Sequence, residues 1–174
     1  MIAQISEFRM PRYREIPDVG LYLDQTVKYM NRYLAPLGCM EITTSMVSNY
    51  VKKGIIGHPI KKKYTREQLA GLIYIVVSKT VLSMENIDTL FKMQRQHYSA
   101  AQAYDYFCEE VENCLPYVFG LTHTIRDLAA DAGEEKLLLR STIIAAVNKM
   151  FLDCAFAVMH QEQALWPDIL ADLA

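Results

Sequence analysis

The segment from Glu41 to Phe91 constrains the fold more than any other part of the chain, because helix and turn signals alternate in it. Its first part is rich in small polar residues, with Val47 and Val51 giving a narrow apolar face at helical spacing. The sequence Gly54-Ile55-Ile56 predicts where this helix ends, since glycine is favoured just after a helix C-terminus. Gly57-His58-Pro59 cannot continue it.

A short basic strand and a capped helix are expected next. Ile60 to Tyr64 reads as an extended strand with Lys61 and Lys63 on one side. Residues 65–68, Thr-Arg-Glu-Gln, form a capping-box signature that opens an apolar helix. Polar helix, turn, basic strand and apolar helix in this order have the layout of a winged helix-turn-helix. In that layout, short polar side chains reach base edges and lysines reach phosphates.

Positive charge is concentrated in the same segment. Residues 41–66 hold six Lys and Arg and one acid, which gives +5, so the other 148 residues carry −7 of the chain's −2. Such a surface attracts nucleic-acid phosphates. Three consecutive lysines are also typical of a solvated edge strand, where they discourage edge pairing. The combination of signals, rather than the lysines alone, favours DNA binding.

We therefore predict an interface with double-stranded DNA in two parts. Ser45 and Asn49 are four residues apart and share a helix face, and asparagine can bind adenine through two hydrogen bonds. The residues predicted at the major groove are Thr44, Ser45, Ser48 and Asn49. The residues predicted to hold phosphates are Tyr50, Lys52, Lys53, Lys61, Lys62, Lys63 and Arg66, with Tyr64 as a further residue of the interface.

The rest of the chain predicts further helices. Apolar periodicity and capping signals give helices over Leu21–Leu34, from Ser83, from Ser99 to near Pro116 and Gly120, over Thr122–Ala132, and from Glu134 to about Gln163. The last of these is apolar nearly all round, so several of its faces must be covered. It is either the central helix of a bundle or shared with a second subunit.

The N-terminal segment Met1–Pro17 has few periodic signals and two prolines, and it is basic. We expect an irregular arm that packs on the domain through Phe8 and Tyr13, in preference to an arm that reaches into a minor groove. The predicted fold is mainly all-α. A DNA-binding domain with its arm spans 1–96, and a helical dimerisation or effector domain spans 97–174.

The sequence gives no sign of catalysis or metal binding. It has no nucleophile, phosphate-loop, dinucleotide or zinc-protease motif, so we expect neither an enzyme nor a cofactor. The four cysteines form no CxxC pair, and we expect buried, reduced thiols. They are Cys39, Cys108, Cys114 and Cys154. Four acids are expected to form a solvated helix face: Asp105, Glu109, Glu110 and Glu112.

Nothing in the sequence indicates export or a membrane. The N-terminus lacks the apolar core of a signal peptide. The most apolar run, Ile143–Met159, contains Asn148, Lys149 and Asp153, which argue against a membrane span. We expect a cytoplasmic protein.

Residues 43–91 resemble the winged helix-turn-helix of MerR-type regulators. Tyr50 with Lys52-Lys53-Gly54-Ile55-Ile56 is similar to the end of the recognition helix in that family, and Lys62-Lys63-Tyr64-Thr65 to the end of its basic wing. Residues 81–87 are similar to the segment that follows the next helix, after the wing, in that family. Residues 16–25, 45–54 and 62–64 resemble a bacterial family of unknown function, common in low-GC Gram-positive bacteria, with a MerR-like DNA-binding half.

This resemblance implies a transcriptional regulator with no established ligand. The sequence therefore predicts a cytoplasmic, dimeric, MerR-like DNA-binding regulator with a possible small-molecule effector. One alternative is an interaction module whose basic patch docks on an acidic protein. Another is a helical domain in the C-terminal half that binds or converts a small ligand.

Overall fold

The computed structural model describes residues 5–37, 41–128 and 133–162, and the side chains up to residue 160. The described chain is mainly α-helical. Its helices are α2 (Leu23–Leu34), α3 (Thr44–Lys52), α4 (Arg66–Ser78), α5 (Met84–His97), α6 (Ala100–Val118) and α7 (Glu134–Glu162). Two short 3-10 helices are η1 (Tyr13–Glu15) and η2 (Ala35–Leu37), and the strands are β1 (Leu21–Tyr22) and β2 (Lys63–Tyr64).

The helix starts predicted at Thr65, Ser83 and Ser99 are confirmed, and side-chain caps explain them and the start of α3. The hydroxyls of Thr43, Thr65, Ser83 and Ser99 each accept a hydrogen bond from the backbone N–H three residues later. Each bond satisfies one of the N–H groups that a helix N-terminus leaves without an internal partner. Local sequence therefore determines where α3 to α6 begin.

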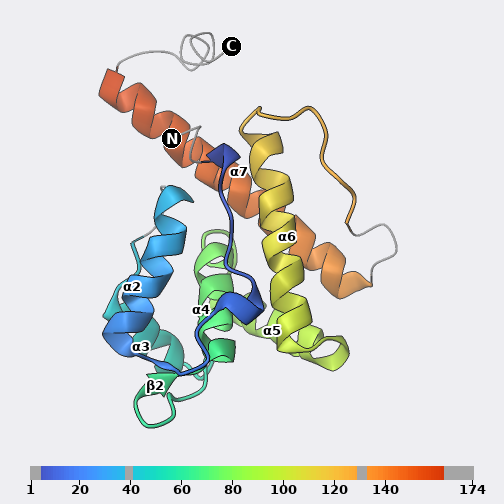
Figure 1. Cartoon of the computed structure of the whole chain (residues 1–174). Coiled ribbons are helices and arrows are strands. Elements are labelled where there is room, and N and C mark those ends of the chain that lie inside the picture. The colour runs from blue at the N-terminus through green and yellow to red at the C-terminus, as the bar shows by residue number, and fades with distance from the viewer. Residues whose placement is uncertain (1–4, 38–40, 129–132, 163–174) are drawn as a thin grey trace.

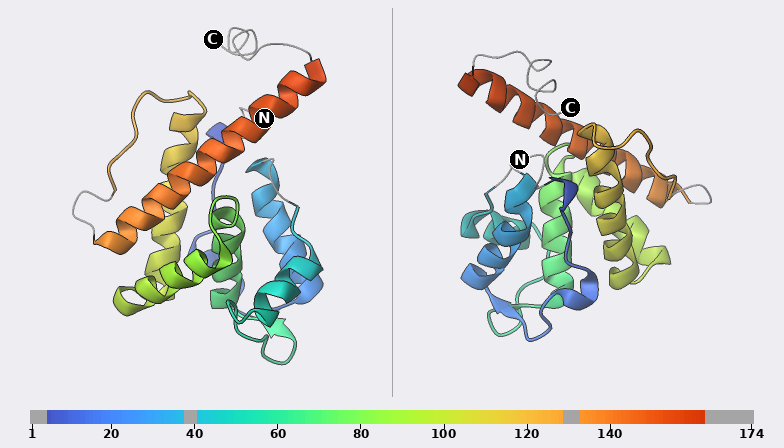
Figure 2. Two further views of the ribbon diagram at one scale, coloured as in Figure 1. Left: turned by 180° about the vertical axis from the view of Figure 1, so that it is seen from behind. Right: turned by 45° about the horizontal axis from the view of Figure 1, so that its top comes forward.

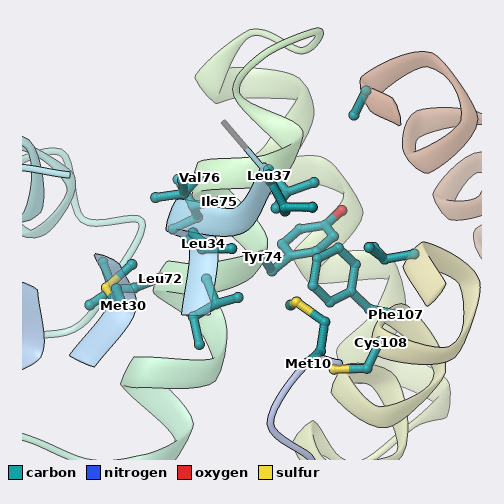
Figure 3. Close-up of a cluster of buried hydrophobic side chains, with 14 of the residues drawn as sticks. Met10, Met30, Leu34, Leu37, Leu72, Tyr74, Ile75, Val76, Phe107 and Cys108 are labelled. Carbon is teal, nitrogen blue, oxygen red and sulfur yellow. The ribbon is translucent and has the colours of Figure 1, made fainter. Parts of the chain in front are cut away.

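Helix α4 is the central element of the fold. Nine of its thirteen residues are buried, including Leu69, Leu72 and Ile73, because the helix packs against α2, α6 and α7. Figure 3 shows Tyr74 of α4 against Phe107 of α6, with ring centroids 5.3 Å apart, and Met10 beside Cys108. Buried residues of the N-terminal arm and of all the helices from α2 to α7 form one core cluster.

Helix α7 lies across one end of the molecule, opposite the β1–β2 sheet (Figures 1 and 2). One side of it packs on α4, α5 and α6, where Leu139, Ile143 and Val147 are buried. On its other side Leu152 is 48% exposed and Phe156 is 55% exposed. Within the described residues, α7 is also the one helix long and apolar enough to span a membrane; buried core helices of other proteins meet the same criterion.

The N-terminal arm packs on the domain as predicted. Phe8, Met10 and Ile16 are buried, and Arg12 forms an ion pair with Glu112 of α6. The backbone N–H of Tyr13 donates to Asp105 at 2.7 Å.

The prediction that the acids of α6 form a solvated face is therefore wrong for most of them. Asp105 and Glu112 bind the arm, and Glu110 is fully buried beside Tyr106 and Arg140. Glu109 alone of the four is exposed. Sequence spacing could not show this, because the arm and the acids lie about a hundred residues apart.

The helix predicted over Thr122–Ala132 is also wrong for the residues that the structure describes there, 122–128, which are not helical. The Asn113 side chain donates to Arg126 O and accepts from Arg126 N, at 2.8 and 3.1 Å. Arg140 binds the same carbonyl and Asp127. These tertiary hydrogen bonds satisfy backbone groups that a helix would otherwise pair internally. Residues 129–132 lie outside the described part.

The strand predicted over Ile60–Tyr64 is shorter than expected. Lys63 and Tyr64 pair antiparallel with Tyr22 and Leu21 of β1, and Ile60 bridges back to Lys63. The two residues between them form a turn, so the predicted alternation of lysines along one strand is wrong. The division into domains at residues 96 and 97 stays a prediction; α5 ends at His97.

Candidate nucleic-acid interface

Helix α3 presents a polar face to solvent. Val47, Tyr50 and Val51 are buried and attach the helix to the core, while the positions between them face outward. The exposed side chains are those of Ser45, Ser48, Asn49, Lys52 and Lys53. Thr44, the first helical residue, is half-buried. The predicted major-groove residues therefore share one accessible helix face, apart from the partial burial of Thr44.

The start of α3 is fixed against α2 by one amide side chain. Asn31 Nδ2 donates to Ile42 O at 2.9 Å, and Asn31 Oδ1 accepts from Ile42 N at 2.8 Å. This pair of bonds ties the backbone two residues before α3 to the last turn of α2. At its other end, α3 stops at Gly54, which has a φ of 72°. A positive φ is readily adopted by glycine and ends the helix.

The basic segment after α3 forms a tight two-residue hairpin. Ile60 N donates to Lys63 O and Lys63 N donates to Ile60 O, both at 2.9 Å. The two central residues, Lys61 and Lys62, have φ of 49° and 66°. Two consecutive positive φ values define a type I′ turn, which normally favours asparagine and glycine. Lysine in this conformation costs about 1–2 kcal/mol per residue.

The hairpin packs closely on the segment that precedes α2. A Cβ atom on Gly20 would lie 3.1 Å from Lys63 Cβ, so glycine permits the close approach of the two segments. The Lys63 ammonium lies 5.3 Å from the centroid of the exposed Tyr22 ring. On the other side, Gln68 Nε2 donates to Gly57 O at 2.7 Å and holds the loop that leads into the hairpin. The hairpin is thus anchored at both ends.

The positive charge of this surface is not neutralised within the part of the chain that the structure describes. No ion pair there involves Lys52, Lys53, Lys61, Lys62 or Lys63. In Figures 1 and 2, α3 and the hairpin lie at the same end of the molecule, away from α7. The combined surface can offer five ammonium groups and short hydrogen-bonding side chains to an anionic partner.

Three of the predicted interface residues belong to the fold: the phosphate contacts Tyr50 and Arg66, and Tyr64. Tyr50 and Tyr64 are each 4% exposed, and burial raises the pKa of both phenols above its usual value. Both rings belong to the core. Arg66 Nε donates to Ile16 O at 2.7 Å, and its guanidinium also lies near Asp18 and over the Tyr13 ring. Arg66 therefore fastens the N-terminal arm to α4.

Two residues of this surface were missed by the sequence-based prediction. Tyr22 is 50% exposed beside Lys63, and Ile60 is 64% exposed at the hairpin. Both lie in segments too short for a periodic pattern. The exposure of these two side chains can be recognised only once the pairing of β1 with β2 is known.

The structure gives no indication of metal chemistry in the residues it describes. They contain no group of three or more His, Cys, Asp or Glu side chains that could hold an ion. Cys108, Cys114 and Cys154 are buried and reduced, as predicted, and Cys39 lies outside the described residues. Burial raises the pKa of Cys108 and of Cys114 to about 12, so both stay protonated at neutral pH.

Comparison with known proteins gives one match. No curated protein and no solved structure is significantly similar to the chain. A family model described as a domain of unknown function (DUF1836) matches residues 11–107, which run from the N-terminal arm into α6 and include the whole candidate interface. The chain therefore belongs to the DUF1836 family.

Proposed function

We propose that this protein is a regulator that binds double-stranded DNA through α3 and the Ile60–Lys63 hairpin. In this proposal α2 and α3 form a MerR-like helix-turn-helix and the hairpin is its wing. The exposed face of α3 enters the major groove, with Ser45, Ser48 and Asn49 against base edges. Lys52, Lys53 and the three hairpin lysines lie against phosphates.

The conformation of the hairpin turn is the observation that carries the proposal. Lys61 and Lys62 occupy two left-handed positions where asparagine and glycine would be more stable. Both side chains are exposed, and neither has an ion pair in the described residues. The lysines therefore add no evident stability to the fold. A contact with an anionic ligand gives a physical reason for lysine at these two positions, because strained turns often serve binding.

Duplex DNA fits this surface better than an acidic protein does. The cations lie beside a helix face of small hydrogen-bonding residues, and that pairing matches groove and backbone recognition. An acidic protein partner requires the lysines and gives no role to Ser45, Ser48 and Asn49. Apolar residues, which dominate the centre of protein interfaces, are absent from the described outward face of α3.

We also propose that the protein binds as a homodimer through α7. The outward side of α7 carries Leu138, Ala145 and Leu152 at seven-residue spacing, all exposed, with Phe156 one turn further. Seven-residue spacing of apolar residues is typical of helix pairs. A two-fold dimer would present two copies of α3 to a palindromic site.

The salt dependence of duplex binding tests the DNA-binding proposal. Lys61→Ala/Lys62→Ala/Lys63→Ala should weaken binding to every duplex and flatten the dependence of log K on log salt by about two to three units. The matched control replaces Lys79, Lys92 and Lys136, which lie outside the interface. An unchanged slope in the hairpin variant would show that the hairpin does not touch DNA.

A polyglutamate competitor separates DNA from an acidic protein partner. If the surface is built for duplex DNA, the duplex displaces polyglutamate at equal charge concentration. Asn49→Ala then weakens duplex binding and leaves polyglutamate binding unchanged. Equal binding of both polyanions, with no effect of Asn49→Ala, would favour the acidic partner.

A further inference from the structure

A cleft of about 510 Å³ lies between α4, α5, α6 and the loop that joins α3 to the hairpin. Each helix contributes one face to its wall. The lining residues repeat at helical spacing in α4 (Glu67, Ala70, Gly71, Tyr74), in α5 (Phe91, Gln94, Arg95) and in α6 (Ala100, Ala103, Tyr104, Phe107), and Tyr98 follows the end of α5. Loop residues 54–58 and Ile60 close one side. The volume is in the range of small-molecule sites.

The walls of this cleft combine small residues with aromatic rings. Ala70, Ala100 and Ala103 leave room between the helices, and five rings surround that room. They belong to Tyr74, Phe91, Tyr98, Tyr104 and Phe107. Tyr74 stands at an angle to both Phe91 and Phe107, with centroids 4.9 and 5.3 Å apart. Such walls favour a planar aromatic guest, which gains both stacking and edge-to-face contacts.

One polar side chain of the lining is available to a ligand. Gln94 lines this cleft, and no hydrogen bond to its side chain occurs in the described part of the chain. Its amide can both donate and accept a hydrogen bond. A ligand with hydrogen-bonding atoms on its edge can therefore bind Gln94.

The sign of the ligand's charge follows from Arg95. Its guanidinium stands 5.6 Å from the centroid of the Phe91 ring at the cleft, with no ion pair in the described residues. Glu67, the one acid of the lining, lies in the first turn of α4. Arg95 is therefore available to an anionic group on a ring that stacks near Phe91.

A second cleft nearby differs in chemistry. It measures about 300 Å³ and is lined by Asp105, Glu109, Glu135 and Lys136 among others. Three carboxylates against one ammonium disfavour an anion there. Gln94, Tyr98 and Ala103 line both clefts, whereas Ala100 and Arg95 line the larger one only.

We propose that the larger cleft is a binding site for a planar aromatic small molecule that carries an anionic group. The rings of Phe91, Tyr98 and Tyr104 hold the aromatic part, and Arg95 holds the anion. The Gln94 amide binds polar atoms on the edge of the ligand. The site does not depend on the proposed DNA-binding function.

Two fluorescent dyes test the site on the full-length protein. Anilinonaphthalene sulfonate has the proposed chemistry, and phenylnaphthylamine is its neutral counterpart. Both should bind with a stoichiometry of one per chain. Ala100→Phe fills the cleft and should weaken both dyes by about tenfold or more. The matched control is Ala101→Phe, because Ala101 is similarly half-buried and does not line the cleft.

A second pair of variants tests the anion. Arg95→Gln should weaken the sulfonate about threefold to fivefold, as expected for an exposed charge pair, and leave the neutral dye unchanged. Lys92→Gln, on the same helix and outside the cleft, should change neither. Melting curves verify that each variant is folded.

Three results would overturn the proposal. The first is the absence of saturable dye binding by the folded wild type. The second is equal dye binding by Ala100→Phe and Ala101→Phe. The third is an equal effect of Arg95→Gln on both dyes, which would remove the anionic group from the proposal.

Discussion

Arg12 and Glu112 form a bidentate ion pair, with Nη1 3.0 Å from Oε1 and Nη2 2.6 Å from Oε2. Glu112 Oε1 also accepts from the backbone N–H of Met10 at 2.9 Å. One carboxylate therefore binds both the Arg12 guanidinium and the backbone of the N-terminal arm. This links residues a hundred positions apart and directs the arm across α6.

Glu112→Ala should destabilise the protein by about 2–3 kcal/mol, because it leaves a half-buried guanidinium and a backbone N–H without their acceptor. Glu109→Ala, on the same helix and exposed, is the control and should change stability by less than about 0.5 kcal/mol. Urea denaturation measures both. Equal stability of the two variants would mean that the arm contributes little to the fold.

Lys61→Asn/Lys62→Gly separates the conformation of the hairpin from its charge. Asparagine and glycine suit a type I′ turn, so the variant should be more stable than the wild type by roughly 1 kcal/mol. If the lysines bind DNA, the same variant should lose duplex affinity and flatten the salt slope by about two units. Thermal melting and binding titrations at several salt concentrations measure the two effects. Unchanged affinity would contradict the proposed role of the turn.

Asn49→Ala addresses sequence specificity. If Asn49 reads an adenine, the change should cost about 1–3 kcal/mol on the selected binding sequence and little on random DNA. Selection of bound sequences from a random pool supplies the target. Asn86→Ala, an exposed asparagine on α5, is the control. Equal losses of affinity for both DNAs would mean that Asn49 contacts the DNA backbone or supports the fold, and does not read a base.

Leu138→Glu/Leu152→Glu tests dimerisation through α7. Both side chains are about half exposed, at 47% and 48%, so the fold should tolerate the change. A dimer held by this face should dissociate, since two carboxylates per chain would be buried without partners. Sedimentation velocity of the full chain is the measurement. A wild type that stays monomeric at high concentration would refute the α7 dimer.

The buried thiols make a prediction about pH. Burial raises the pKa of Cys108 and Cys114 from an ordinary value of 9.0 to about 12. Between these values the unfolded chain loses thiol protons that the folded chain keeps. Their contribution to stability is therefore complete below about pH 9 and falls as the pH rises toward 12. Both thiols should resist iodoacetamide at pH 8 and react once the protein unfolds. Rapid alkylation of Cys108 in the folded protein would contradict this, with urea-unfolded protein as the control.

The sequence by itself determined the local elements. Hydroxyl caps at Thr43, Thr65, Ser83 and Ser99 act within four residues, and the stop at Gly54 depends on its own φ. Apolar spacing then predicted which face of α3 is buried, and so which polar residues are exposed. These features follow from short-range hydrogen bonding and helical geometry, and the sequence shows both directly.

Tertiary structure decided where long-range partners override those local signals. Arg66 is directed to Ile16, and Glu112 to Arg12, by contacts across fifty and a hundred residues. The turn at Lys61 and Lys62 forms because β2 must pair with β1 on one side and Ile60 on the other. Residues 122–128 are not helical, and Asn113 and Arg140 bind the backbone of Arg126 among them. Each of these contacts depends on three-dimensional proximity, which no periodic pattern in the sequence encodes.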